Sequence, residues 1–186
     1  VKDKYSPYEI VVVDDGSTDN TLQVLRDSFG NDPRVRILSH GQNFGRGRAL
    51  RTGFAEARGE FIVSIDADLS YDPMFIGRLI DALSTRPHMH IAVASPYMAG
   101  GGTENVPFFR LLISRLGNKI LSNFMPQKIS TSTGIFRAYR GSAIRAIELE
   151  SNGKEIHLEI LSKAFAVGFG VIEIPAILRG RKVGRS

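Results

Sequence analysis

The chain contains no cysteine among its 186 residues. This absence excludes a disulfide framework and a thiolate metal site, and it fits a reducing compartment. No apolar run approaches the roughly 18 residues that a membrane-spanning helix needs, and no stretch resembles a signal peptide. We therefore expect any contact with a membrane to occur at its surface. Internal repeats and low-complexity segments are also missing, which favours a single domain.

The composition is that of an ordinary globular domain, with 42% hydrophobic and 23% charged residues. Lys and Arg number 24 against 19 Asp and Glu, which gives a formal net charge of +5. This modest positive charge favours anionic partners, whether nucleotide, lipid phosphate or nucleic acid. Because no basic motif is interleaved with aromatic residues, we do not expect a nucleic-acid-binding module.

Short apolar runs alternate with helical patterns along the chain. The expected strands cover residues 10–13, 35–38, 61–65, 91–95, 134–139 and 171–174. The expected helices cover residues 19–29, 45–58, 73–84, 107–125, 142–149 and 155–167. This alternation is typical of an α/β fold with a mostly parallel sheet flanked by helices.

The expected helix at residues 107–125 carries an apolar stripe. Its members are Phe108, Phe109, Leu112, Leu116, Ile120 and Phe124. Such a stripe more often belongs to a protein core, so we expect it to be buried. The basic residues Arg110, Arg115 and Lys119 on the same helix keep contact with a membrane surface open as an alternative.

Two carboxylates, Asp66 and Asp68, directly follow the third expected strand. In an extended chain these positions share one face, so both side chains can reach the same ligand. Mg2+ and Mn2+ typically bind one or two protein carboxylates and complete their coordination with water and substrate phosphates. The pair therefore predicts a metal and diphosphate site. The simpler interpretation is that Asp68 caps the next helix and Asp66 is a solvated acid.

The first expected strand also ends in acids, Asp14 and Asp15, followed by Gly16. Ligands of open α/β sheets bind beyond the carboxyl ends of the strands. An aspartate there can accept hydrogen bonds from a base or a ribose, and Gly16 permits a tight turn. Paired acids after a first strand also occur in phosphoacceptor receiver domains. A receiver would carry a single acceptor aspartate after its third strand, whereas this chain carries two.

A glycine-spaced basic stretch opens the second expected helix. Gly45 and Gly47 let the backbone approach a diphosphate, and Arg46 or Arg48 supplies charged donors beside the helix N-terminus. Alone this pattern is weak, because glycine-rich helix entries are common. Its order along the chain, between the two acidic strand ends, is much more specific.

Taken together, these motifs resemble the GT-A glycosyltransferases of family 2, in particular the polyprenyl-phosphate sugar transferases such as the dolichol-phosphate mannose synthases. The resemblance extends over nearly the whole chain. The motifs that carry it are VVVDDGSTDNT, NFGRGRALRTG, DADLSYDP, SPYMAGGG, TGIFRAYR, IHLEI and RKVGRS. It implies transfer of a sugar, with inversion, from a nucleotide diphosphate to a lipid phosphate. GDP-mannose is the favoured donor and UDP-glucose the alternative.

The resemblance also implies roles for particular residues. Asp66 and Asp68 would hold Mg2+ or Mn2+, and Ser70 is a further candidate ligand. The implied catalytic residues are Asp68, Arg137, Glu159 and Arg181. The implied substrate-binding residues are Asp14, Asp15, Gly16, Gly45, Gly47, Arg48, Asp66, Arg137 and Arg181. Within this second set, Arg137 and Arg181 would bind the acceptor phosphate or the pyrophosphate.

The resemblance further implies one GT-A catalytic domain over residues 1–186. Family members begin with a strand and a loop that have no counterpart here, so we expect a domain that lacks its first strand and is truncated at the N-terminus, and also at the C-terminus. We expect a peripheral position at the cytoplasmic face of a membrane, where a polyprenyl phosphate is met. His157 is expected to be an ordinary polar residue on a helix face.

The acceptor decides whether a general base is needed. A lipid phosphate has a second pKa near 6 and is already mostly an anion at neutral pH. A sugar hydroxyl, as in glycan extension, would need a base, and Glu159 would be the candidate. For a lipid phosphate, Glu159 is better interpreted as a group that orients an arginine or a sugar hydroxyl.

Overall fold

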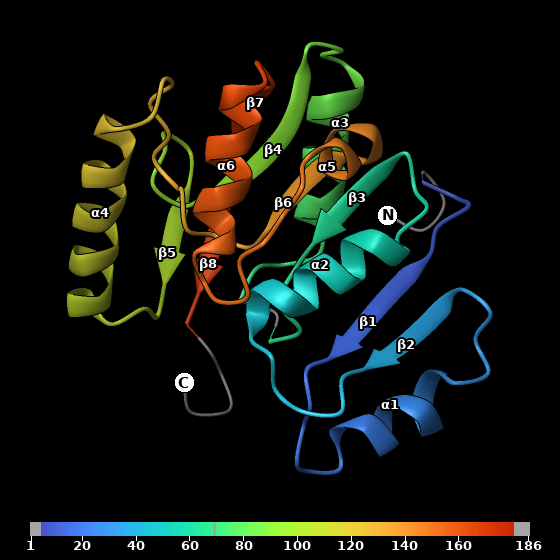
Figure 1. Ribbon diagram of the computed structural model, residues 1–186. Helices are drawn as coiled ribbons and strands as arrows, with labels where there is room; N and C mark the ends of the chain where they lie inside the picture. Colours follow the sequence, from blue (N-terminus) through green and yellow to red (C-terminus); the bar gives the residue numbers. More distant parts are fainter. Residues whose placement is uncertain (1–4, 69, 181–186) are drawn as a thin grey trace.

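The computed structural model describes residues 5–68 and 70–180 (Figure 1). The strands are β1 (Ile10–Asp14), β2 (Val35–Ser39), β3 (Phe61–Ser64), β4 (Met89–Ser95), β5 (Gly102–Glu104), β6 (Arg137–Arg140), β7 (Gly170–Pro175) and β8 (Ile177–Arg179). The helices are α1 (Thr21–Phe29), α2 (Arg46–Glu56), α3 (Phe75–Ser84), α4 (Phe108–Asn123), α5 (Gly141–Ala146) and α6 (Ile156–Ala166). Every expected element is present, although β6 begins later than predicted. The short strands β5 and β8 were not expected, because three residues are too few to show a period.

Four strands form the central sheet in the order β3-β6-β4-β7. Strands β4 and β7 are parallel, whereas β6 runs antiparallel to both of its neighbours. Two further parallel pairs, β1-β2 and β5-β8, form separate ladders. The expected mostly parallel α/β sheet is therefore confirmed, with β6 as its reversed strand. An apolar run identifies a strand but not its direction, so the sequence did not indicate the reversal.

The central sheet carries a hydrophobic core on each face. Side chains alternate along β4, so Ile91 and Val93 face one core while Ala92 and Ala94 face the other. Helices α2, α5 and α6 contribute to the first core. Helix α3 covers the alanine face and buries Leu79 completely. Helices therefore pack on both faces of the central sheet, and the candidate site is built at the ends of its strands.

Helix α4 contradicts the expectation of a buried stripe. None of its described residues belongs to either core. The side chains of the predicted stripe are exposed instead, from 50% for Ile120 to 76% for Phe109 within the helix and 84% for Phe124 just after it. In Figure 1 the helix stands at the flank of the molecule, apart from the main sheet. No helix in residues 5–68 and 70–180 is long and apolar enough to cross a membrane.

Candidate active site

The predicted acidic pair lies in the turn that follows β3. Asp66 is partly exposed, with a side chain that is 31% accessible, and its Oδ1 lies 3.8 Å from Nη2 of Arg46. Arg46 is the first residue of α2. Asp68 is also partly exposed, and its Oδ1 accepts a hydrogen bond from the Ser70 N–H at 3.0 Å. The acidic strand end and the basic helix entry therefore meet, and Arg46 is the arginine that lies beside Asp66.

The donors at this edge fit an open site for a hard divalent cation. Within the described parts of the chain, no group of three or more His, Asp or Glu side chains could enclose a metal ion. Asp66 and Asp68 provide carboxylate oxygens only, the ligand type that Mg2+ and Mn2+ prefer. Such an ion would take its remaining ligands from water and from the phosphates of a substrate.

Asp14 and Gly16 shape the turn after β1. Asp14 is buried, with 6% of its surface exposed. Its Oδ2 accepts a hydrogen bond from Ser39 Oγ at 3.2 Å, and its Oδ1 accepts one from Ser17 Oγ. Gly16 has φ +71, and a Cβ there would lie 2.3 Å from the carbonyl carbon of Gln42. These residues hold the turn in place, and their contact with a nucleoside stays a prediction.

Asp15 fixes the loop that leads into α2. Its Oδ2 accepts the Gly45 N–H at 2.8 Å, and its Oδ1 accepts the Phe44 N–H at 3.1 Å. The same Oδ1 lies 2.7 Å from Nδ1 of His40. Burial opposes ionisation, but the hydrogen bonds from His40 and the two backbone donors outweigh it and lower the pKa of Asp15. The carboxylate therefore organises the glycine-rich entry directly.

The glycine spacing of that entry serves a close backbone contact. The Gly47 N–H donates to the carbonyl of Asn152 at 2.6 Å. A Cβ on Gly45 would lie 2.5 Å from the Asn152 oxygen, and a Cβ on Gly47 would lie 2.5 Å from the Ser151 oxygen. The space that a side chain would need is therefore filled by the loop at residues 151–153. Arg48 is exposed on the first turn of α2. Contact of Gly45, Gly47 or Arg48 with a diphosphate stays a prediction.

Glu159 anchors the same loop from α6. Its two carboxylate oxygens accept the Glu150 N–H at 2.8 Å and the Ser151 N–H at 2.9 Å, and Lys163 Nζ donates to it at 2.7 Å. Burial alone would raise the pKa of Glu159, but these hydrogen bonds lower it to about 2. A carboxylate that acidic is a weak base at neutral pH. Glu159 forms its salt bridge with Lys163, and within residues 5–68 and 70–180 no arginine donates to it.

Arg137 is fully buried at the start of β6. Its Nη1 donates to the carbonyl of His157 at 2.9 Å, and its Nη2 donates to the carbonyl of Ser132 at 2.6 Å. The guanidinium therefore ties β6 to α6 and to the loop before β6. The predicted contact of Arg137 with an acceptor phosphate stays untested, and Arg181 lies outside the described residues.

His157 lies on α6 as expected, but it is buried, with 1% of its surface exposed, and is therefore not an ordinary polar residue. Neither ring nitrogen has a hydrogen-bond partner in the described structure. Burial, then the positive charges of Arg137 and Arg46, lower the pKa of His157 to about 3. The imidazole is therefore neutral at physiological pH. The sequence placed His157 on a helix but gave no sign that its face turns inward.

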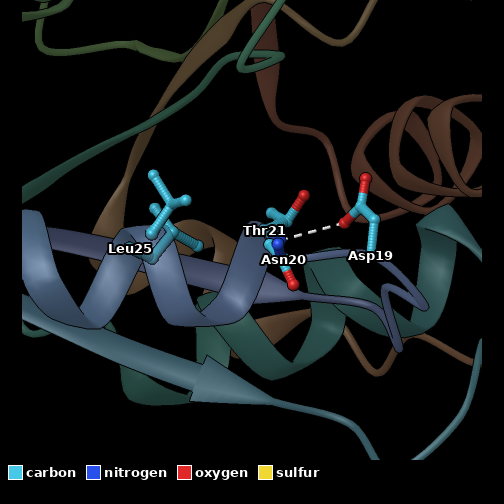
Figure 2. A pocket seen from close by; sticks show the side chains of 5 residues that line it. Asp19, Asn20, Thr21 and Leu25 are labelled. Atoms are coloured by element: carbon cyan, nitrogen blue, oxygen red, sulfur yellow. Dashed lines mark hydrogen bonds between the residues drawn. The ribbon is translucent and has the colours of Figure 1, made fainter.

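An open hollow lies elsewhere, at the start of α1 (Figure 2). Its lining consists of Asp19, Asn20, Thr21, Val24 and Leu25. The Thr21 N–H donates to Asp19 Oδ1 at 3.0 Å across its rim, as Figure 2 shows. None of the predicted site residues contributes to this lining, so the hollow is separate from the acidic strand end.

Comparison with known proteins agrees with the sequence motifs. The family model described as Glycosyl transferase family 2 matches residues 1–148. The chain is 35% identical over 181 residues to a dolichol-phosphate mannosyltransferase of Pyrococcus furiosus, covering 96% of this chain and 50% of that protein. It is 33% identical over 184 residues to a polyprenol monophosphomannose synthase of Mycolicibacterium smegmatis. That match covers 95% of this chain and 69% of the relative. The chain thus spans about half the length of the first relative.

Solved structures share the fold. The glucosyl-3-phosphoglycerate synthase of Mycobacterium tuberculosis, crystallised in complex with Mn2+, uridine diphosphate and glucosyl-3-phosphoglycerate, superposes with a TM-score of 0.72 at 20% identity. The superposition covers 95% of this chain and 62% of that one. The expected α/β glycosyltransferase fold is confirmed, and the comparisons give no support to a receiver domain.

Proposed function

Because this chain belongs to glycosyl transferase family 2, we propose that it transfers mannose from a nucleotide diphosphate sugar to a polyprenyl phosphate, with inversion. The observation that carries the proposal is the ion pair between Asp66 and Arg46 just after β3, with Asp68 two residues further along the same turn. This edge offers both a hard-metal site and a fixed positive charge for a diphosphate. The names of the two curated relatives favour mannose and a polyprenyl phosphate, and we take GDP-mannose as the donor ahead of UDP-glucose.

The chemistry at this site requires positioning more than proton transfer. A lipid phosphate attacks as an anion, so no general base is needed, which agrees with the low pKa of Glu159. Mg2+ or Mn2+ on Asp66 and Asp68 would neutralise charge on the departing nucleoside diphosphate. Arg46 adds a fixed cation beside Asp66. Glu159 acts at a distance, by fixing the loop that packs on the start of α2.

The buried cation Arg137 is assigned a positioning role in this proposal. Both of its terminal nitrogens already donate to backbone carbonyls, so it holds the start of α6 against the sheet. We retain Arg181 as the candidate that binds the acceptor phosphate. A peripheral position at a membrane surface follows from the acceptor, because a polyprenyl chain resides in the bilayer.

The test is a donor and metal experiment on the purified protein. Binding of GDP-mannose and of UDP-glucose is measured by calorimetry with Mn2+ and with excess EDTA, and turnover is measured with a polyprenyl phosphate. Asp66→Asn and Asp68→Asn should each abolish metal-dependent donor binding, whereas Asp27→Asn, an exposed acid on α1, should leave it unchanged. Full donor binding or turnover in EDTA would exclude the assigned metal site.

A further inference from the structure

The backbone amides that open α2 already have partners. The Gly47 N–H donates to the carbonyl of Asn152 at 2.6 Å, and the Arg48 N–H donates to the same carbonyl at 3.3 Å. One residue before the helix, the Gly45 N–H donates to the Asp15 carboxylate at 2.8 Å. The first amides of a helix are the groups that usually bind an anion. Here protein oxygens occupy them, which favours a side chain of α2 as the group that meets an anion.

Arg46 stands between these contacts. The bond from Gly47 to Asn152 fixes the backbone on one side of it, and the bond from the preceding glycine to Asp15 fixes the backbone on the other side. The Arg46 side chain is 34% accessible, and its Nη2 lies 3.8 Å from Oδ1 of Asp66. Arg46 is therefore a partly exposed cation beside a predicted metal ligand, and its position depends on the carbonyl of Asn152.

Arg51 on α2 holds the loop that supplies this carbonyl. Its Nη1 donates to the carbonyl of Glu150 at 2.7 Å and to Oδ1 of Asn152 at 3.1 Å. Hydrogen bonds from a guanidinium are stronger than those between neutral groups. Arg51 follows Gly47 by four residues, so both lie on the same face of the helix. Helix and loop are thus joined by a closed ring of hydrogen bonds through Gly47, Asn152 and Arg51. Glu159 secures the same loop from α6.

We propose that Arg51 is a positioning residue for the nucleotide-sugar donor. By holding Asn152 on the start of α2, it keeps the Arg46 guanidinium beside Asp66, at the edge assigned to the diphosphate. Arg51 acts through the loop, because its Nη1 donates to loop oxygens. The inference rests on the proposed function, since it concerns the donor of that reaction. A purely structural clasp would affect stability alone, so the two roles predict different results.

The experiment is calorimetric titration of GDP-mannose and of UDP-glucose with Mn2+ present, together with kcat and donor KM for transfer to a polyprenyl phosphate. Arg51→Gln should weaken donor binding and raise the donor KM about tenfold, the effect of losing about one charge-assisted hydrogen bond, with little change in kcat. Arg51→Lys keeps the charge but loses the planar fork, and it should bind the donor within about threefold of wild type. The matched control is Arg58→Gln, which removes an exposed arginine just beyond the other end of α2 and should bind the donor like wild type.

Amide hydrogen exchange measures the hold on the loop directly, without a donor. In wild type the Asn152 carbonyl accepts the Gly47 and Arg48 amides and should protect them. Arg51→Gln should make both amides exchange about tenfold faster, whereas Arg58→Gln should not. Asn152→Ala removes the side-chain oxygen that Arg51 binds and should give a smaller increase. It takes the place of Arg51→Gln if circular dichroism shows that Arg51→Gln is not folded.

Three outcomes would overturn the proposal. If Arg51→Gln melts at a lower temperature but binds the donor like wild type, the clasp is structural only. A reduced kcat with an unchanged donor KM would place the effect in the transfer step instead. Unchanged exchange of the two amides would show that Arg51 does not hold the loop. Wild-type protein that binds neither nucleotide sugar would refute the proposed function, and the exchange result would still show whether Arg51 holds the loop.

Discussion

Two glycines on α2 allow a sharp test of the contact between the helix entry and the loop at residues 151–153. In Gly47→Ala the new Cβ would meet Ser151 O at 2.5 Å, Asn152 C at 2.7 Å and Gly153 O at 2.8 Å, so backbone must move. Overpacking of this kind costs about 1–3 kcal/mol, and weakening the bond from Gly47 N–H to the Asn152 carbonyl costs about 1 kcal/mol more. The higher helix propensity of alanine offsets about 1 kcal/mol of this destabilisation. We expect a net loss of about 2 kcal/mol in the free energy of unfolding.

The matched control is Gly53→Ala, on the same helix. Its Cβ would meet only Val13 Cγ2, at an ordinary 3.6 Å. Replacing a helical glycine without a clash stabilises by about 0.4–1 kcal/mol. For a domain of this size, 1 kcal/mol shifts Tm by about 2–4 °C, so Gly47→Ala should melt about 4–8 °C lower and Gly53→Ala slightly higher than wild type. Calorimetry and urea denaturation measure both. Equal stability of the two variants would show that the loop does not pack on α2 as described.

Two predictions concern buried or anchored groups. Glu159→Gln should lower the free energy of unfolding by about 1–2 kcal/mol, because an amide cannot accept all three hydrogen bonds that the carboxylate accepts. Turnover should remain measurable. A variant that is folded but inactive would instead show that Glu159 acts as the general base. In wild type, the ionised Glu159 stabilises the fold above its ordinary pKa of 4.5, and this stabilisation is lost as pH falls towards 2. The free energy of unfolding of the variant should therefore lack this part of the decrease at acid pH. The pKa of His157 is about 3 in the folded chain and ordinarily 6.5. As pH falls below 6.5, the unfolded state therefore takes up a proton that the folded state does not. The free energy of unfolding should fall by about 1.4 kcal/mol for each pH unit. Urea titrations at pH 7.5 and 5 should show this slope in wild type and a flatter one in His157→Gln, and equal slopes would contradict the burial of a neutral imidazole.

Local patterns in the sequence predicted the elements and the acidic strand end. Period-2 and period-3.6 apolar spacing identified the strands and helices, and the positions of Asp66 and Asp68 just after β3 predicted their place at the sheet edge. The direction of β6 was not predictable, because reversing a strand leaves its apolar pattern unchanged. The exposure of α4 was equally hidden, since a stripe of Phe and Leu looks the same whether it meets a core or a lipid surface.

Contacts between distant segments account for the rest of the site. The sequence predicted that Gly45 and Gly47 let the backbone approach a diphosphate, which stays untested. The backbone that a Cβ would meet at these positions belongs to a segment far along the chain, at Asn152. Likewise, the burial of His157 depends on which face of α6 turns to the sheet, where Arg137 meets its carbonyl. Long-range packing of this kind is not encoded in any local motif.

The position of α4 outside both hydrophobic cores also determines where the molecule opens most easily. The helix is held by hydrogen bonds such as that between Ser132 and Asn118 and buries little apolar surface, so detaching it costs far less than global unfolding. Its amides should therefore exchange hydrogen early, well before those of β4. Any ligand that binds α4 only while the helix is attached to the rest of the protein would slow this exchange, so the protection of the α4 amides would report such binding.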